Sequence, residues 1–182
     1  MKEKRMDDVR MCRMSSFRHN AGFGKRIEYS IIAQMLKEGM DVYVPLVADN
    51  GIDAVVRRED GSFVEVQIKA RSRDVNPGDE ALFAGIRHEW RPNYWFVFYA
   101  EGVRRAEDDG EPVPITWVMS SKEFLDESYC NKKGKNVGSR TIWFNGRKKG
   151  VSYAKKEFDK YIVEKLSDRI LRQNTDKSGE AS

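Results

Sequence analysis

The chain has 182 residues, of which 40% are hydrophobic and 34% are charged, which suits one domain with a core of its own and a very polar surface. Its formal net charge of +4 and its pI of about 9.0 permit nucleic-acid binding without requiring it. Cys12 and Cys130 are too few for a disulfide framework and lack zinc-ligand spacing, so we expect two reduced thiols. No apolar run suits a signal peptide or a membrane span, which predicts a soluble cytoplasmic protein without a membrane partner.

The N-terminal part divides into an arm and a helix. Residues 1–20 carry many charges without a clear period and predict a flexible basic arm. Residues 22–38 predict a helix, because Ile27, Ile31 and Met35 recur at the spacing of one helical face. We expect a single domain over residues 21–172, with its core over 22–128, and a disordered tail over 173–182.

Strand patterns follow the helix. Residues 41–47, 52–58 and 63–70 are rich in β-branched and aromatic residues, and the turn at 59–62 predicts that the last two form a hairpin. On the last strand Glu65, Gln67 and Lys69 share one face, because side chains alternate along a strand.

The rest of the chain predicts mixed elements. We expect a short helix near residues 79–88, a buried strand over 94–99, a further strand over 115–119, and a helix capped by Ser120 and Glu123. A basic segment spans 131–150, and the pattern over 154–172 predicts a closing helix. This order favours an α/β (α+β) fold with a central mixed β-sheet flanked by helices.

The hairpin strands carry the residues with the clearest chemistry. A hairpin brings Asp53 near Gln67 and Lys69, and such a polar group in a sheet is costly unless something is bound. Hard cations such as Mg²⁺ prefer oxygen ligands, which Asp53, Gln67 and the backbone carbonyl of Ile68 can supply. Lys69 could then orient or deprotonate a water molecule, or stabilise charge at a phosphoryl group.

Three segments together resemble the PD-(D/E)xK nuclease superfamily, which has the restriction-endonuclease-like fold. They are Gly24-Lys-Arg-Ile-Glu28, Gly51-Ile-Asp53 and Val66-Gln67-Ile68-Lys69. The resemblance covers roughly residues 22–120 and is nearest to the Holliday-junction-resolvase-like and related uncharacterised branches. It implies that Glu28, Asp53 and Lys69 belong to an endonuclease site that hydrolyses phosphodiester bonds with the help of Mg²⁺ or Mn²⁺. The expected substrate is DNA. Because many members are dimers, the resemblance also implies a homodimer.

One position departs from the family pattern. The acidic residue two positions before the lysine is replaced by Gln67, as in some members that include a branch of intron-encoded homing endonucleases. The expected metal ligands are therefore Asp53, Gln67 and Glu28, with Glu65 as a further candidate. The lost charge leaves a second interpretation open, a catalytically inactive nuclease-like module that binds nucleic acid.

Plainer roles remain open for the same residues. Glu28 could be a solvated helix residue, Asp53 a turn cap, Lys69 a lysine that protects a sheet edge, and Glu65 an ion-pair partner. The basic residues could contact nucleic-acid backbone, with Trp143 and Phe144 stacking on bases, or form a solvated face. These basic residues are Arg71, Arg73, Arg87, Lys132, Lys133, Lys135, Arg140, Arg147, Lys148 and Lys149. With His19 and His88 as the only histidines, a histidine-based centre is not expected.

Overall fold

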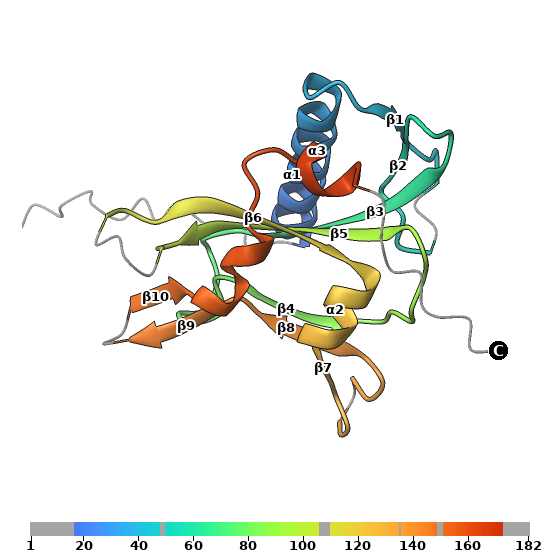
Figure 1. Cartoon of the computed structure of the whole chain (residues 1–182). Helices are drawn as coiled ribbons and strands as arrows, with labels where there is room; N and C mark the ends of the chain where they lie inside the picture. Colours follow the sequence, from blue (N-terminus) through green and yellow to red (C-terminus); the bar gives the residue numbers. More distant parts are fainter. Residues whose placement is uncertain (1–16, 48–49, 106–109, 135, 149–150, 173–182) are drawn as a thin grey trace, which may run out of the picture.

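A computed structural model describes residues 17–47, 50–105, 110–134, 136–148 and 151–172. Its main sheet has five strands in the order β1-β2-β3-β5-β6 (Figure 1). The strands β3 and β5 are parallel, whereas each other neighbouring pair is antiparallel. Their bounds are Asp41–Tyr43 for β1, Ala54–Arg57 for β2, Phe63–Arg71 for β3, Tyr94–Val103 for β5 and Val113–Ser120 for β6. The predicted central mixed sheet is confirmed.

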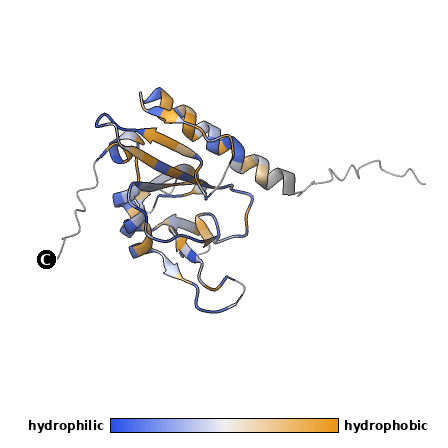
Figure 2. Cartoon of the chain, turned by 90° about the vertical axis from the view of Figure 1, so that its right-hand side faces the viewer, coloured by the Kyte–Doolittle hydropathy of each residue, from blue (hydrophilic) through white to orange (hydrophobic). Residues whose placement is uncertain are grey.

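One face of this sheet is covered by helices. The long helix α1 (Phe17–Lys37) and the short helix α3 (Ser167–Ile170) lie on the same side of the sheet (Figure 1). From α1, Ile31, Ile32 and Met35 pack against the aliphatic face of β2 and β3. In Figure 2 hydrophobic colours gather in the strands beneath α1. The apolar period that predicted this helix therefore marks the face that it buries.

The other face is covered by smaller elements and is rich in aromatic residues. The strands β4 (Leu82–Ile86), β8 (Arg140–Trp143) and β7 (Tyr129–Cys130) form a three-stranded sheet. The pair β9 (Asn145–Lys148) and β10 (Val151–Ala154), the helix α2 (Ser121–Glu127) and the 3₁₀ helix η1 (Lys156–Tyr161) complete this layer. Phe96 and Phe98 of β5 meet Phe83, Phe124 and Phe144 from these elements.

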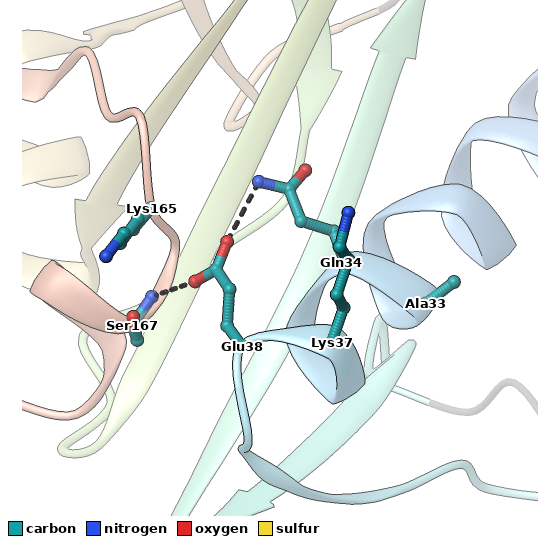
Figure 3. Close-up of a pocket in the computed structure, with 6 residues that line it drawn as sticks. All are labelled: Ala33, Gln34, Lys37, Glu38, Lys165 and Ser167. Carbon is teal, nitrogen blue, oxygen red and sulfur yellow. Dashed lines mark hydrogen bonds between the residues drawn. The ribbon is translucent and has the colours of Figure 1, made fainter.

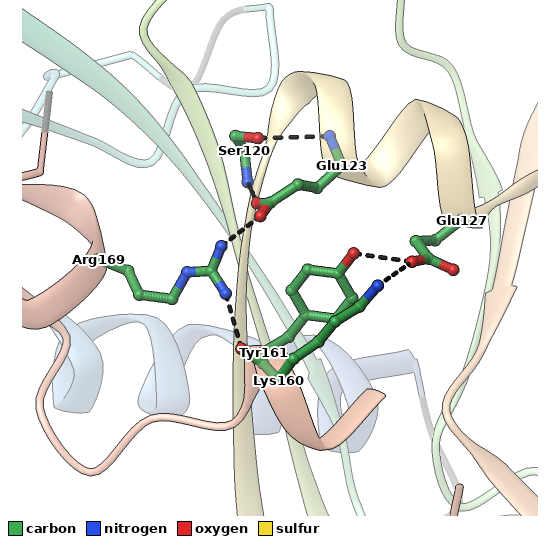
Figure 4. Close-up of polar contacts among 6 residues, drawn as sticks. All are labelled: Ser120, Glu123, Glu127, Lys160, Tyr161 and Arg169. Atoms are coloured by element: carbon green, nitrogen blue, oxygen red, sulfur yellow. Dashed lines mark hydrogen bonds and ion pairs between the residues drawn. The ribbon is translucent and has the colours of Figure 1, made fainter. Parts of the chain in front are cut away.

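A polar network ties this layer to α3. The Ser120 hydroxyl accepts from the Glu123 backbone while the Glu123 carboxylate accepts from Ser120 N, which confirms the predicted capping box (Figure 4). The same Glu123 carboxylate pairs with Arg169. One oxygen of Glu127 accepts from Lys160 Nζ and from the Tyr161 hydroxyl, both at 2.8 Å. These contacts fix α2, η1 and α3 relative to one another.

Several boundaries differ from the sequence prediction. Helix α1 begins at Phe17, so the end of the predicted arm is helical, and residues 1–16 of that arm lie outside the described part. The strand predicted over 41–47 pairs only as far as Tyr43, and Pro45 lies just beyond it, where a missing N–H weakens pairing. The tail over 173–182 also lies outside the described residues.

Two predicted helices are wrong. Residues 82–86 of the helix expected near 79–88 form strand β4, whose bulge places Gly85 at a φ of +75°. The closing helix expected over 154–172 is replaced by β10, η1 and α3. Ile162 forms a bridge with Trp117, and Val163 N donates to Thr116 O. Pairing with β6 therefore interrupts the helical pattern. No helix of the described part is both long and apolar enough to cross a membrane.

Candidate active site

The first residue of the site is Asp53, immediately before β2. Its N–H donates to Val66 O at 2.9 Å, and its Oδ2 accepts from Ile68 N at 2.7 Å. The register Ala54↔Val66 places Asp53 beside Gln67, as the predicted hairpin requires. Asp53 therefore bonds to the neighbouring strand rather than capping its own turn.

Gln67 and Lys69 lie on the same face of β3 and open into one cleft. This cleft has a volume of about 290 Å³, and residues 82–87 of the β4 region line its opposite wall. Strand β2 begins at Ala54, which pairs with Val66 of β3. Beyond Val66, β3 therefore continues without β2 beside it. Yet β3 is an inner strand between β2 and β5, so Lys69 does not protect a sheet edge.

The charge of Asp53 links the hairpin to α1. Burial raises the pKa of this carboxyl most strongly, and the N–H of Ile68 opposes the rise. The negative charge of Glu28 raises the same pKa further, whereas the charges of Lys69 and Lys25 lower it. Helix α1 packs against β3, and through this contact the charges of Glu28 and Lys25 act on Asp53.

Lys69 is the cation of the cleft. Burial lowers its pKa from the ordinary value, and the charge of Asp53 opposes that fall. Within the described residues it makes no side-chain hydrogen bond or ion pair. Its ammonium group is therefore available to a bound anion or to a water molecule.

Gln67 is buried but unpaired. Its exposed fraction is 9%, and across the described part of the chain its amide group makes no hydrogen bond. The amide packs against Gly51, where any Cβ would overlap Gln67 Nε2 and would lie 3.4 Å from the Tyr94 hydroxyl. Because Gln67 lines the cleft, its amide oxygen is free to serve as a neutral ligand to a bound cation.

Glu28 of α1 forms an ion pair with Lys25. Lys25 Nζ lies 2.6 Å from Glu28 Oε1, and the Glu28 side chain is only 14% exposed. A solvated helix residue would be more open. Glu28 is therefore a largely buried carboxylate near Asp53 that is neutralised by Lys25.

Glu65 has the plainer role. Its carboxylate pairs with Arg91 Nη2 at 2.5 Å, and the Arg91 guanidinium lies 4.7 Å from the centre of the Tyr94 ring. Among the described residues no group of three or more His, Cys, Asp or Glu side chains is placed to hold a metal ion. A metal here would depend on Asp53, Glu28 and the neutral oxygen of Gln67.

The predicted basic residues differ in what they contact. Arg71 Nε donates to Leu82 O at 2.9 Å, and Arg140 Nη1 donates to Leu125 O at 2.9 Å, so both brace the fold. Arg73 lies 3.6 Å from Glu101. Arg87 is exposed and lines the cleft, which places it best for contact with a substrate.

The predicted basic segment is not one surface. Phe144 is fully buried, so its predicted stacking role is wrong, and Trp143 Nε1 donates to Gly78 O at 3.0 Å. Lys132, Lys133 and Arg147 are exposed, and Arg147 also lies against Gly78. Lys135, Lys149 and the Lys148 side chain lie outside the described part.

Two contributors escaped the sequence prediction. Tyr94 donates to Gly51 O at 2.8 Å and so fixes the loop before Asp53, but its place in an aromatic run indicates only a core residue. Lys25 lies three residues before Glu28, a spacing at which helix side chains meet. That spacing could have identified Lys25.

A larger cavity lies away from these residues. It has a volume of about 800 Å³ and lies between the C-terminal part of α1 and the segment before α3 (Figure 3). Glu38 is its only acidic lining residue and accepts from Ser167 N and Gln34 Nε2, both at 2.9 Å. Its polar groups serve the packing of α1 against α3.

Comparisons with known proteins found similarity in structure but not in sequence family. No protein-family model and no curated protein matches the sequence. Among solved structures, the chain is similar to the bacterial homing endonuclease I-Ssp6803I, with 19% sequence identity and a TM-score of 0.41. The match covers 64% of this chain and 85% of that chain. A similarity with so low a TM-score carries no argument about activity or substrate.

Proposed function

We propose that the chain is a Mg²⁺-dependent endonuclease of the PD-(D/E)xK type that hydrolyses phosphodiester bonds in DNA. The observation that carries the proposal is the Gln67 amide, which makes no hydrogen bond among the described residues, beside the half-buried carboxylate of Asp53. Lys69 faces the same cleft. A carboxylate, an amide oxygen and a lysine gathered at one point are costly to fold unless the site binds a ligand.

The donor set fits a hard divalent cation. Asp53 would contribute a charged oxygen, Gln67 a neutral one, and Glu28 a second carboxylate, directly or through water. Hard cations of this kind accept oxygen ligands and keep several water molecules. When bound, such an ion supplies Lewis-acid catalysis and a more acidic water molecule.

Residues of the chain itself would transfer the proton and stabilise the charge on the phosphate. Burial lowers the pKa of Lys69, which brings its amine closer to proton transfer near neutral pH. In its charged form the same group would stabilise the negative charge that develops on the phosphoryl oxygens. The exposed Arg87 on the opposite wall of the cleft would contact the DNA backbone.

The test is cleavage of supercoiled, linear and branched DNA by the wild type, Asp53→Asn and Asp60→Asn. Asp60 provides a matched control, because its Oδ1 also accepts a backbone N–H, from Ser62 at 2.8 Å, at the far end of the same hairpin. We expect Mg²⁺-dependent cleavage by the wild type and Asp60→Asn, and a loss of at least about 100-fold in Asp53→Asn. Equal activity in Asp53→Asn would reject the assignment.

The inactive binding module is the second outcome of this experiment. It is favoured by the neutral Gln67 and by the lack of a larger acidic cluster in the described part of the chain. A wild type that binds DNA but cuts none of these forms at any Mg²⁺ or Mn²⁺ concentration would establish it.

A further inference from the structure

Lys25 holds a position in which it contacts one proposed metal ligand. Its ammonium group lies 2.6 Å from Glu28 Oε1. Helix α1, which carries both residues, packs against β3 of the hairpin. Lys25 is therefore a cation paired with one carboxylate of the proposed site.

The two lysines of this region are differently placed. Lys69 projects from β3 into the cleft and is substantially buried. The Lys25 side chain is 52% exposed, so its ammonium group can leave Glu28 for water at little cost. A partly exposed ion pair of this kind is weak and exchangeable.

We infer that Lys25 is an internal counter-cation that competes with the divalent metal for Glu28. The inference rests on the proposed metal site and adds a residue that sets its affinity. Without metal, the ammonium neutralises the Glu28 carboxylate. When a metal binds, Lys25 must release Glu28, and its remaining charge opposes the incoming cation.

The direction of the effect follows from these charges. Replacing Lys25 with a neutral side chain leaves Glu28 unpaired and makes the site more negative. A divalent cation is then bound more tightly, because it no longer displaces a partner and meets less positive charge. If Lys25 were only a surface residue of the helix, its replacement would change the metal affinity no more than the replacement of a neighbouring charged residue.

The test is calorimetric titration of Mn²⁺ into the wild type, Lys25→Met and Arg26→Met, with circular dichroism to establish that each variant is folded. Arg26 is a matched control: it is the next residue, is exposed, and carries the same charge on the same helix. We expect the Kd for Mn²⁺ to fall about threefold or more in Lys25→Met, beyond any change in Arg26→Met. Addition of Glu28→Gln to Lys25→Met should abolish that gain.

Two results have distinct meanings. Equal or weaker Mn²⁺ binding in Lys25→Met than in Arg26→Met would overturn the role of Lys25 while leaving the metal site intact. A wild type that binds no Mn²⁺ at all would instead reject the proposed function, and the inference with it.

Discussion

The residues of the proposed site occupy positions that lower the stability of the folded protein. Asp53 is a carboxylate whose burial raises its pKa, and Gln67 is a buried amide without a partner in the described chain. Both costs fall within two adjacent strands, where Gly51 and Tyr94 hold the loop before Asp53. Residues that are costly for folding and gathered at one cleft are typical of a functional site.

Asp53→Asn should stabilise the metal-free protein at neutral pH. The folded pKa of Asp53 lies above its unfolded value, so the folded state binds more protons between the two values and loses stability as pH rises through that window. Asparagine keeps an oxygen that can accept from Ile68 N without the charge. We expect Tm at pH 7 in a chelator to rise by roughly 2–4 °C.

Below about pH 3.9, where the unfolded carboxyl is also protonated, the difference between wild type and Asp53→Asn should vanish. Thermal melts across this pH range measure it. A Tm for Asp53→Asn below that of the wild type at pH 7 would contradict the cost assigned to this carboxylate.

Gly51 should be intolerant of a side chain for two separable reasons. Its φ is +72°, and a Cβ would overlap the Gln67 amide. Gly61 has a similar φ of +81° with nothing within 4 Å, so Gly61→Ala isolates the backbone cost. We expect Gly61→Ala to lose about 1 kcal/mol in urea unfolding, and Gly51→Ala up to about 1 kcal/mol more, because the end of the Gln67 side chain must shift. Similar losses in both variants would show that Gln67 does not pack against Gly51.

The sequence identifies these residues unevenly, for physical reasons. Asp53, Gln67 and Lys69 could be grouped because strand alternation and a short hairpin leave one arrangement. Glu28 needed the packing of α1 beside the hairpin, which no local pattern specifies. Tyr94 could not be found, because a core aromatic residue and one that donates to a loop carbonyl look the same in sequence.

At the scale of elements, two segments with helical sequence patterns form other structures because they pair with strands elsewhere in the fold. The 79–88 segment was predicted to be helical, yet Phe83 and Leu82 pair with β8 and bury Phe83 in the aromatic layer. The 154–172 pattern has apolar residues at helical spacing, but Ile162 bridges to Trp117. In contrast, the start of α2 could be predicted, because a capping box is a local contact.

The start of α2 should be sensitive to loss of its cap. Ser120→Ala removes the hydroxyl that accepts from Glu123 N at 3.3 Å, and Glu123 also pairs with Arg169 of α3. We expect a loss of about 1 kcal/mol in the free energy of unfolding, measured by urea denaturation. The exposed Lys122 of the same helix gives the control Lys122→Ala, which should cost far less, and equal losses would exclude a capping role.

At the scale of the whole molecule, the proposed site draws on both faces of the sheet, and the cleft itself lies between β3 and the β4 region. The helical layer brings Glu28 and Lys25 to the hairpin, and the aromatic layer brings the β4 region opposite Lys69. Neither layer alone contains the proposed site. The mixed sheet could be predicted from the order of patterns, but the cleft depends on β4, a strand that the sequence predicted as a helix.

Asp53 and Gln67 would together hold one divalent cation where β2 begins beside β3. The most direct measurement is an anomalous difference map from crystals of the full chain soaked in MnCl₂. We predict one strong peak bound by Asp53 and the Gln67 amide oxygen, with Glu28 turned towards it, and no such peak in Asp53→Asn. An empty site in the wild type at saturating Mn²⁺, or a peak bound elsewhere and unchanged in Asp53→Asn, would contradict the account.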